Sequence, residues 1–91
     1  DDKIIVSGLI TPSSGTFEST WKIVNIERYP NARVTVYDVN GQEVFASNGY
    51  RNDWGGTFKN TNSLLPSSSY YYIIDLRTGR APIKGWLYIT Y

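Results

Sequence analysis

The chain has 91 residues and a formal net charge of +1, and it contains no cysteine and no histidine. The sequence therefore offers no disulfide, no thiolate nucleophile, no histidine general base and no histidine zinc ligand. The small net charge also disfavours nucleic-acid binding, which needs a basic face. These exclusions argue against an enzyme and favour a binding, targeting or structural role.

Length and aromatic content indicate one folded domain over residues 1–91. Aromatic side chains make up 15% of the chain, which argues against disorder. No apolar run approaches the roughly 18–20 residues needed to cross a bilayer, so the sequence predicts no transmembrane segment. The chain opens at Asp1 with neither an initiator methionine nor a signal peptide. We interpret it as a piece of a longer protein.

The first part of the chain shows short runs of strand-forming residues separated by turn residues. Residues 3–10 form the first predicted strand, ended by the loop signal that begins at Thr11-Pro12. Residues 21–26 form the second, because three of them are β-branched and a proline follows at position 30. A short helix over residues 18–26, capped by Ser19, is the alternative.

The strongest local pattern is a hairpin over residues 33–46. Two alternating runs flank Asn40-Gly41, and this dipeptide is typical of a type I′ turn, in which both central residues have positive φ. Val34 and Val36 share one face of the first run, while Tyr37 and Val39 share the other. Apolar groups on both faces predict an interior strand of a packed sheet.

An irregular stretch over residues 47–62 follows, rich in asparagine and glycine, with aromatic side chains at Tyr50, Trp54 and Phe58. Aromatic residues in such a loop usually fold back as plugs over the end of a core. An exposed platform for a ligand is the alternative.

A second hairpin is predicted from residues 70–76 and 83–91, joined by a turn at 77–80. In its last strand, Ile83, Leu87 and Ile89 share the predicted core face. Lys84, Trp86 and Tyr88 share the opposite face. With the earlier segments, this gives an all-β fold: an Ig-like antiparallel β-sandwich of about seven short strands.

Catalytic and metal-binding signatures are weak throughout the sequence. Carboxylates fall mostly at segment ends, and Asp38 and Asp75 suit turn chemistry. A calcium loop over residues 11–19 would have Glu18 as its only carboxylate. We therefore predict no catalytic residue, no cofactor and no metal site.

Surface recognition by aromatic side chains is the remaining possibility. Trp86 and Tyr88 stand two apart on one strand, and Tyr70 and Tyr72 stand two apart on the strand before it. Paired across the hairpin, these rings would form a ladder able to stack on sugar rings or to dock a protein. Cross-strand packing inside a two-sided core is the alternative.

Three cations lie close together near the end of the chain. The second half of the sequence, residues 46–91, has five basic and two acidic side chains, and Arg77, Arg80 and Lys84 are among the basic ones. A solvated hairpin tip is the simple interpretation of this cluster. A selective surface for a protein partner is the other.

The order of these pieces resembles a known family over residues 10–91. The matching fragments include Thr11-Pro12, Tyr29-Pro30-Asn31, Leu65-Pro66, Tyr70-Tyr71-Tyr72 and Lys84-Gly85-Trp86. In this order and at this spacing they resemble the gliding motility-associated C-terminal domain. That family is the type B sorting domain of the type IX secretion system in Bacteroidota.

Two segments depart from the family pattern. Residues 13–18 replace the Asn/Asp/Gly-rich segment that usually follows the Thr-Pro pair. Residues 38–41 replace the usual Asn-Arg-Trp-Gly turn, which keeps a hairpin but loses an aromatic side chain and a cation. The chain thus resembles a divergent member, and any ion-binding role of the first segment is placed in doubt.

The resemblance implies a sorting module at the end of a large, adhesin-like protein of the cell surface or the medium. It implies recognition by the type IX translocon and by an outer-membrane protein of the PorP/SprF type. We place the recognition surface on the last hairpin and on the exposed edge at the end of the chain. The residues that we expect to contribute are Arg77, Arg80, Lys84, Gly85, Trp86 and Tyr88. A carbohydrate-binding module and a structural Ig-like spacer are the alternative functions.

Overall fold

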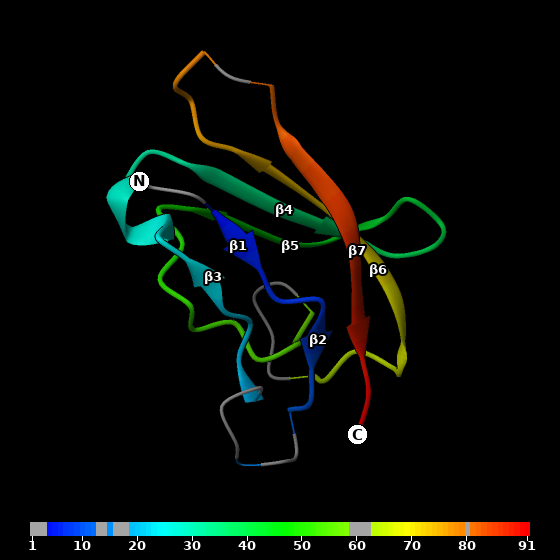
Figure 1. Ribbon diagram of the computed structural model, residues 1–91. Coiled ribbons are helices and arrows are strands. Elements are labelled where there is room, and N and C mark those ends of the chain that lie inside the picture. Colours follow the sequence, from blue (N-terminus) through cyan, green and yellow to red (C-terminus); the bar gives the residue numbers. More distant parts are fainter. Residues whose placement is uncertain (1–3, 13–14, 16–18, 59–62, 80) are drawn as a thin grey trace.

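The computed structural model describes residues 4–12, 15, 19–58, 63–79 and 81–91 (Figure 1). Within them the chain forms seven strands and a turn of 3₁₀ helix, η2, over Ile26–Arg28. The strands are β1 Ile5–Val6, β2 Leu9–Ile10, β3 Ile23–Val24, β4 Arg33–Tyr37, β5 Glu43–Asn48, β6 Ser68–Asp75 and β7 Ile83–Ile89. The predicted all-β sandwich of about seven short strands is confirmed.

Two sheets build the sandwich. The larger has five strands in the order β2-β7-β6-β4-β5, and the smaller pairs β1 with β3. All pairs are antiparallel except β2 with β7, which run parallel, so the larger sheet is mixed rather than purely antiparallel. Strand β4 lies between β6 and β5, which confirms its predicted interior position.

The prediction of one continuous strand over residues 3–10 is wrong, because the chain changes sheets within it. The Ser7 backbone N–H donates to the Lys22 carbonyl in the smaller sheet, at 3.0 Å. The next carbonyl, that of Gly8, accepts from the Tyr88 N–H in the larger sheet, at 2.9 Å. Neighbouring backbone groups thus bond to different sheets, which separates β1 from β2.

Residues 21–26 also form less strand than predicted. Only Ile23–Val24 is strand, and Asn25 then adopts a left-handed conformation with φ of 69°. This turn starts η2, so the helical element lies after the strand and not over residues 18–26 as in the alternative interpretation. The Asn52 Oδ1 atom accepts from the Ile23 backbone N–H at 2.7 Å, which ties β3 to a distant loop.

The first hairpin has the predicted strands but a different turn. Gly41 has φ of 81°, whereas Asn40 does not have positive φ, so the type I′ prediction is wrong. The Gly41 N–H donates to the Asp38 carbonyl, and the Asp38 N–H donates to the Gln42 carbonyl. This pattern is a three-residue loop, a type I turn followed by a left-handed glycine. Val39 consequently lies exposed in the turn and not on a strand face.

The second hairpin follows the prediction closely. Strands β6 and β7 pair along their length, from Ser68 opposite Ile89 to Ile74 opposite Ile83. Leu87 and Ile89 are fully buried, and Ile83 packs against the core. Lys84, Trp86 and Tyr88 are exposed on the opposite face, as the period-2 alternation predicted.

The core lies between the sheets and is closed by the loop that follows β5. Trp21 is fully buried, and its ring lies 5.7 Å from that of Tyr50, 5.9 Å from Trp54 and 5.5 Å from Tyr72. Tyr50 and Trp54 are buried, and Phe58 packs against the same cluster. The prediction that these loop aromatics plug the core is confirmed.

Candidate recognition surface

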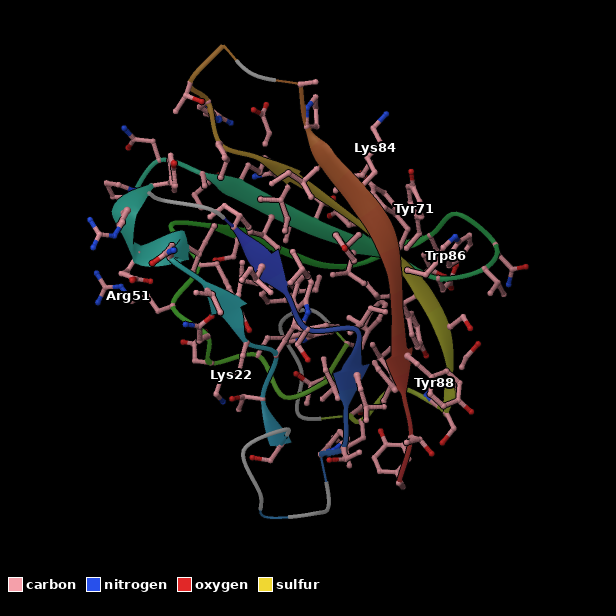
Figure 2. All side chains as sticks on the ribbon, viewed as in Figure 1. Lys22, Arg51, Tyr71, Lys84, Trp86 and Tyr88 are labelled. Atoms are coloured by element: carbon pink, nitrogen blue, oxygen red, sulfur yellow. The ribbon has the colours of Figure 1, made fainter. Side chains whose placement is uncertain are left out.

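One face of the larger sheet carries the exposed aromatic side chains. On β7 alternate residues are buried toward β1 and β3, and the residues between them point to the opposite side. We call this opposite side the outer face. Its side chains include Leu9, Tyr37, Tyr71, Ile73, Lys84, Trp86 and Tyr88. Figure 2 shows Tyr71, Lys84, Trp86 and Tyr88 together on the side of β7 away from β1 and β3.

An aromatic row crosses three strands of the outer face. Trp86 is registered opposite Tyr71, and Tyr71 is registered opposite Tyr37. The Trp86 and Tyr71 ring centroids lie 5.2 Å apart with an interplanar angle of 63°. Trp86 is 62% exposed and Tyr88, two residues along β7, is 47% exposed. The row is therefore accessible at its β7 end.

Trp86 and Tyr88 do not form a ladder with Tyr70 and Tyr72. Tyr70 and Tyr72 are registered opposite Leu87 and Gly85, so both rings point into the core. Burial raises the pKa of both phenols. This is the core-packing alternative, and Tyr71 takes their place beside Trp86. The angle between the rings of Tyr71 and Trp86 also means that this pair offers no flat platform for a sugar ring.

The predicted cations occupy different places in the hairpin. Lys84 is exposed on the outer face, two residues before Trp86 on β7. Arg77 is exposed in the connection between β6 and β7, and its backbone N–H donates to Asp75 Oδ1 at 2.9 Å. Arg80 lies outside the described residues, as does most of the segment 13–18.

Arg77 has an unusual backbone. Its φ of 58° is left-handed, a conformation that costs an L-residue with a Cβ about 1–2 kcal/mol. Among the described residues, the other left-handed positions are glycines or asparagines, which tolerate this conformation. An arginine at a glycine-type position is a backbone outlier that points to a use for its side chain.

Gly85 lies on the inner side of β7, between the two outer-face residues Lys84 and Trp86. A Cβ at this position would lie 2.5 Å from the Tyr72 hydroxyl oxygen and 2.8 Å from the ring carbon that bears it. The missing side chain thus makes room for a core aromatic ring. Its direct role is in packing, and it leaves the flanking residues on the outer face.

The edge of the sheet at the end of the chain is covered. Strand β2 pairs with Tyr88 and Ile89, and the Thr90 N–H donates to the Ile10 carbonyl at 3.1 Å. The expectation of an exposed terminal edge is therefore wrong for these residues. Coverage stops there, because β1 leaves the larger sheet and pairs with β3.

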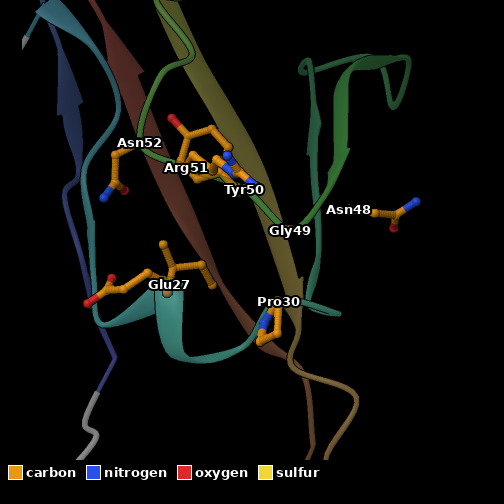
Figure 3. Close-up of a pocket in the computed structure, with 8 residues that line it drawn as sticks. Glu27, Pro30, Asn48, Gly49, Tyr50, Arg51 and Asn52 are labelled. Atoms are coloured by element: carbon orange, nitrogen blue, oxygen red, sulfur yellow. The ribbon is translucent and has the colours of Figure 1, made fainter.

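A cavity of about 550 Å³ opens between η2 and the loop after β5 (Figure 3). Glu27 and Arg51 line it, but Figure 3 shows the Asn48 side chain directed away from the others. Sequence reasoning missed this cavity because its two walls are about 20 residues apart and share no motif. Its polar groups do not converge on one point, so it is a weaker candidate than the outer face.

Two further features bear on function. Within the described ranges, no helix is long and apolar enough to cross a membrane. In the same ranges, no cluster of three or more acidic, histidine or cysteine side chains is placed to hold a metal ion.

Comparison with known families decides the class of the domain. A family model described as the CHU_C type IX secretion signal domain matches residues 4–89, nearly the whole chain. The chain belongs to the CHU_C family. No curated protein matches it, and no solved structure matches it.

Membership of the CHU_C family confirms the predicted resemblance to sorting domains of the type IX secretion system. A CHU_C domain is a non-catalytic targeting module, and such signal domains mark proteins for export across the outer membrane. A targeting role implies an interaction with the secretion system.

Proposed function

We propose that residues 1–91 form the C-terminal sorting domain of a longer, adhesin-like protein of Bacteroidota, of the type associated with gliding motility. In this proposal the domain is recognised by the type IX translocon and by an outer-membrane protein of the PorP/SprF type. The protein then reaches the cell surface or the medium. The observation that carries the proposal is the exposed aromatic row of a CHU_C domain.

Exposed tryptophan and tyrosine side chains favour protein recognition on the outer face. Trp86 is 62% exposed although its neighbours Leu87 and Ile89 are fully buried. Tryptophan and tyrosine are the side chains that most often dominate the energy of protein interfaces, because they bury a large area with few rotatable bonds. Trp86 and Tyr88 are the expected anchors of the complex.

Cations beside these anchors supply selectivity. Lys84 lies on the same face, and Arg77 is held at a left-handed position in the same hairpin. Arg80 follows in the sequence, in the same connection. Charges around an apolar centre mainly set partner choice and association rate. We therefore assign Lys84 to the rim of the surface and Gly85 to support of the strand that presents it, and we expect Arg77 and Arg80 to add positive charge from the connection between β6 and β7.

An export assay tests this function. A reporter with a periplasmic signal peptide is fused upstream of residues 1–91 in a host with a type IX system, and its export is compared with a translocon-deficient strain. We expect reporter at the surface or in the medium only in the intact strain. Retention of a folded fusion in the periplasm of both strains contradicts the sorting function.

Side-chain variants then locate the surface. We expect Trp86→Ala combined with Tyr88→Ala to reduce export at least tenfold. Val24→Ala is the matched control, because Val24 is 48% exposed but lies on β3 in the smaller sheet. If the double variant folds and is exported like the control, recognition does not use the outer face.

A further inference from the structure

We propose that the open edge of β7, residues 83–87, binds an extended acidic segment of the secretion partner as an added strand. The inference rests on the proposed function and names how that partner would be held. The partner strand would bind backbone groups of β7, whereas recognition on the outer face uses side chains.

The β2 side of residues 83–87 is open because the segment before β2 leaves the larger sheet. Strand β2 pairs with only the last two residues of β7, Tyr88 and Ile89. The residues before β2 turn away, and β1 pairs with β3 in the smaller sheet. In Figure 1, β2 lies beside the C-terminal half of β7, while β1 diverges toward β3. No other strand in the described part of the chain pairs with this side of residues 83–87.

The direction of the backbone groups follows from their neighbours. The Tyr88 and Thr90 N–H groups donate to β2-side carbonyls, those of Gly8 and Ile10. In a strand, alternate residues direct their N–H and C=O groups to the same edge. The Lys84 and Trp86 amides consequently point to the β2 side, beyond the end of β2. Among the described residues no strand pairs with them, although Gly8 lies close to the Trp86 carbonyl, so they are the amides that strand addition would use.

The side chains beside this edge define the partner. Lys84 and Trp86 flank the open amides on the outer face. A strand added there places alternate side chains on that face, next to the Lys84 ammonium and the Trp86 ring. An acidic side chain would form an ion pair with the Lys84 ammonium, and an apolar side chain would pack on the Trp86 ring.

Lysine on an open edge also explains why pairing would be selective. A cation at this position discourages indiscriminate pairing with apolar strands. A strand that brings a carboxylate replaces this penalty with an attraction. The lysine thus disfavours general aggregation through this edge and favours pairing with an extended acidic segment.

Proline and alanine at one position separate the backbone from the side chain. Lys84→Ala removes the charge but keeps the amide, whereas Lys84→Pro removes both. Proline is tolerated at an edge whose N–H does not take part in the ladder, so pairing with β6 is kept. We expect Lys84→Ala to reduce export a few-fold and Lys84→Pro to reduce it at least tenfold further, with thermal unfolding confirming the fold of each.

Lys84→Glu provides a second test that does not depend on proline. It keeps the amide and reverses the charge, so we expect it to export less than Lys84→Ala. The inference is wrong if folded Lys84→Pro is exported as well as Lys84→Ala. It is also wrong if Lys84→Glu is exported as well as the unmodified domain. In both cases export of the unmodified fusion still supports the sorting function. If the unmodified fusion is not exported, the function itself fails.

Sedimentation of the purified domain tests the other occupant, a second copy of this chain. We expect a monomer at all concentrations, because a second copy brings the same cation to the edge. A dimer that Lys84→Pro abolishes contradicts the acidic partner and assigns the edge to self-association.

Discussion

Tyr72 lies directly over Gly85, its registered partner across β6 and β7. A Cβ on Gly85 would meet the Tyr72 hydroxyl oxygen at 2.5 Å, and the Tyr72 ring also contacts Trp21, with centroids 5.5 Å apart. A glycine inside a strand usually weakens a sheet, but here the neighbouring aromatic ring covers it. The pair joins the hairpin that bears the outer face to the aromatic centre of the core.

Gly85→Ala should therefore destabilise the domain by about 1–3 kcal/mol, because the added methyl group displaces the Tyr72 ring from its place in the core. Urea unfolding followed by tryptophan fluorescence measures the change. Gly8→Ala is the matched control, since a Cβ there meets nothing closer than 3.9 Å. If both variants have the same unfolding midpoint, the Tyr72 ring moves aside at no cost and the packing argument is wrong.

Tyr50→Phe should also destabilise the domain, by roughly 1–3 kcal/mol. The buried Tyr50 hydroxyl donates to the Trp21 carbonyl at 2.7 Å and accepts from the Trp54 N–H at 3.0 Å. Its removal leaves two buried backbone groups without that partner. Tyr71→Phe is the control, because Tyr71 lies on the outer face, and we expect its unfolding midpoint to stay within about 0.5 kcal/mol of the parent.

Stability should fall at alkaline pH for a related reason. Burial raises the pKa of Tyr50 above its ordinary value near 10, so the folded state holds a proton that the unfolded state has lost. The contribution of the Tyr50 phenol to the free energy of unfolding is constant below pH 10. Above pH 10 it falls by about 1.4 kcal/mol for each pH unit. Thermal unfolding between pH 8 and pH 12 measures this slope. A smaller slope in Tyr50→Phe would assign it to that phenol, and an unchanged slope would assign it to other groups.

The alternation of side chains along β6 and β7 was predictable from the sequence because a strand has a period of two. It placed Leu87 and Ile89 inside and Trp86 and Tyr88 outside. It did not give the registration between the two strands, which set Tyr71 beside Trp86 and turned Tyr70 inward. Registration depends on where the connection between the strands closes, and the predicted turn at 77–80 does not fix how many residues that connection holds.

Tertiary hydrogen bonds explain the other departures. The change of sheet at Ser7 and Gly8 depends on carbonyl and N–H partners from β3 and β7, far away in the sequence. Local propensity carries no information on such partners. The site was accessible to sequence reasoning as a set of exposed residues on β7, whereas its open edge depends on this change of sheet.

The turn between β4 and β5 gives a test that separates two turn types. Asp38 Oδ1 accepts from the Asn40 and Gln42 backbone N–H groups, each at 2.9 Å, and this favours the type I geometry. Gly41→Ala should cost about 1–2 kcal/mol, since φ there is 81°. Asn40→Ala should cost less than about 0.5 kcal/mol, because Asn40 does not have positive φ. Equal costs at both positions, measured by thermal unfolding, indicate a type I′ turn instead.

Arg77 offers a test in which stability and function move in opposite directions. Its left-handed backbone is one that glycine adopts freely, so Arg77→Gly should stabilise the domain by roughly 0.5–1 kcal/mol and raise Tm by a few degrees. If the guanidinium contributes to recognition, the same variant should be exported less efficiently despite its greater stability. Asp75→Ala serves as the comparison, because it removes the acceptor of the Arg77 N–H and should lower stability while keeping the cation. Export of Arg77→Gly at the parental level would show that the strained arginine has no part in sorting.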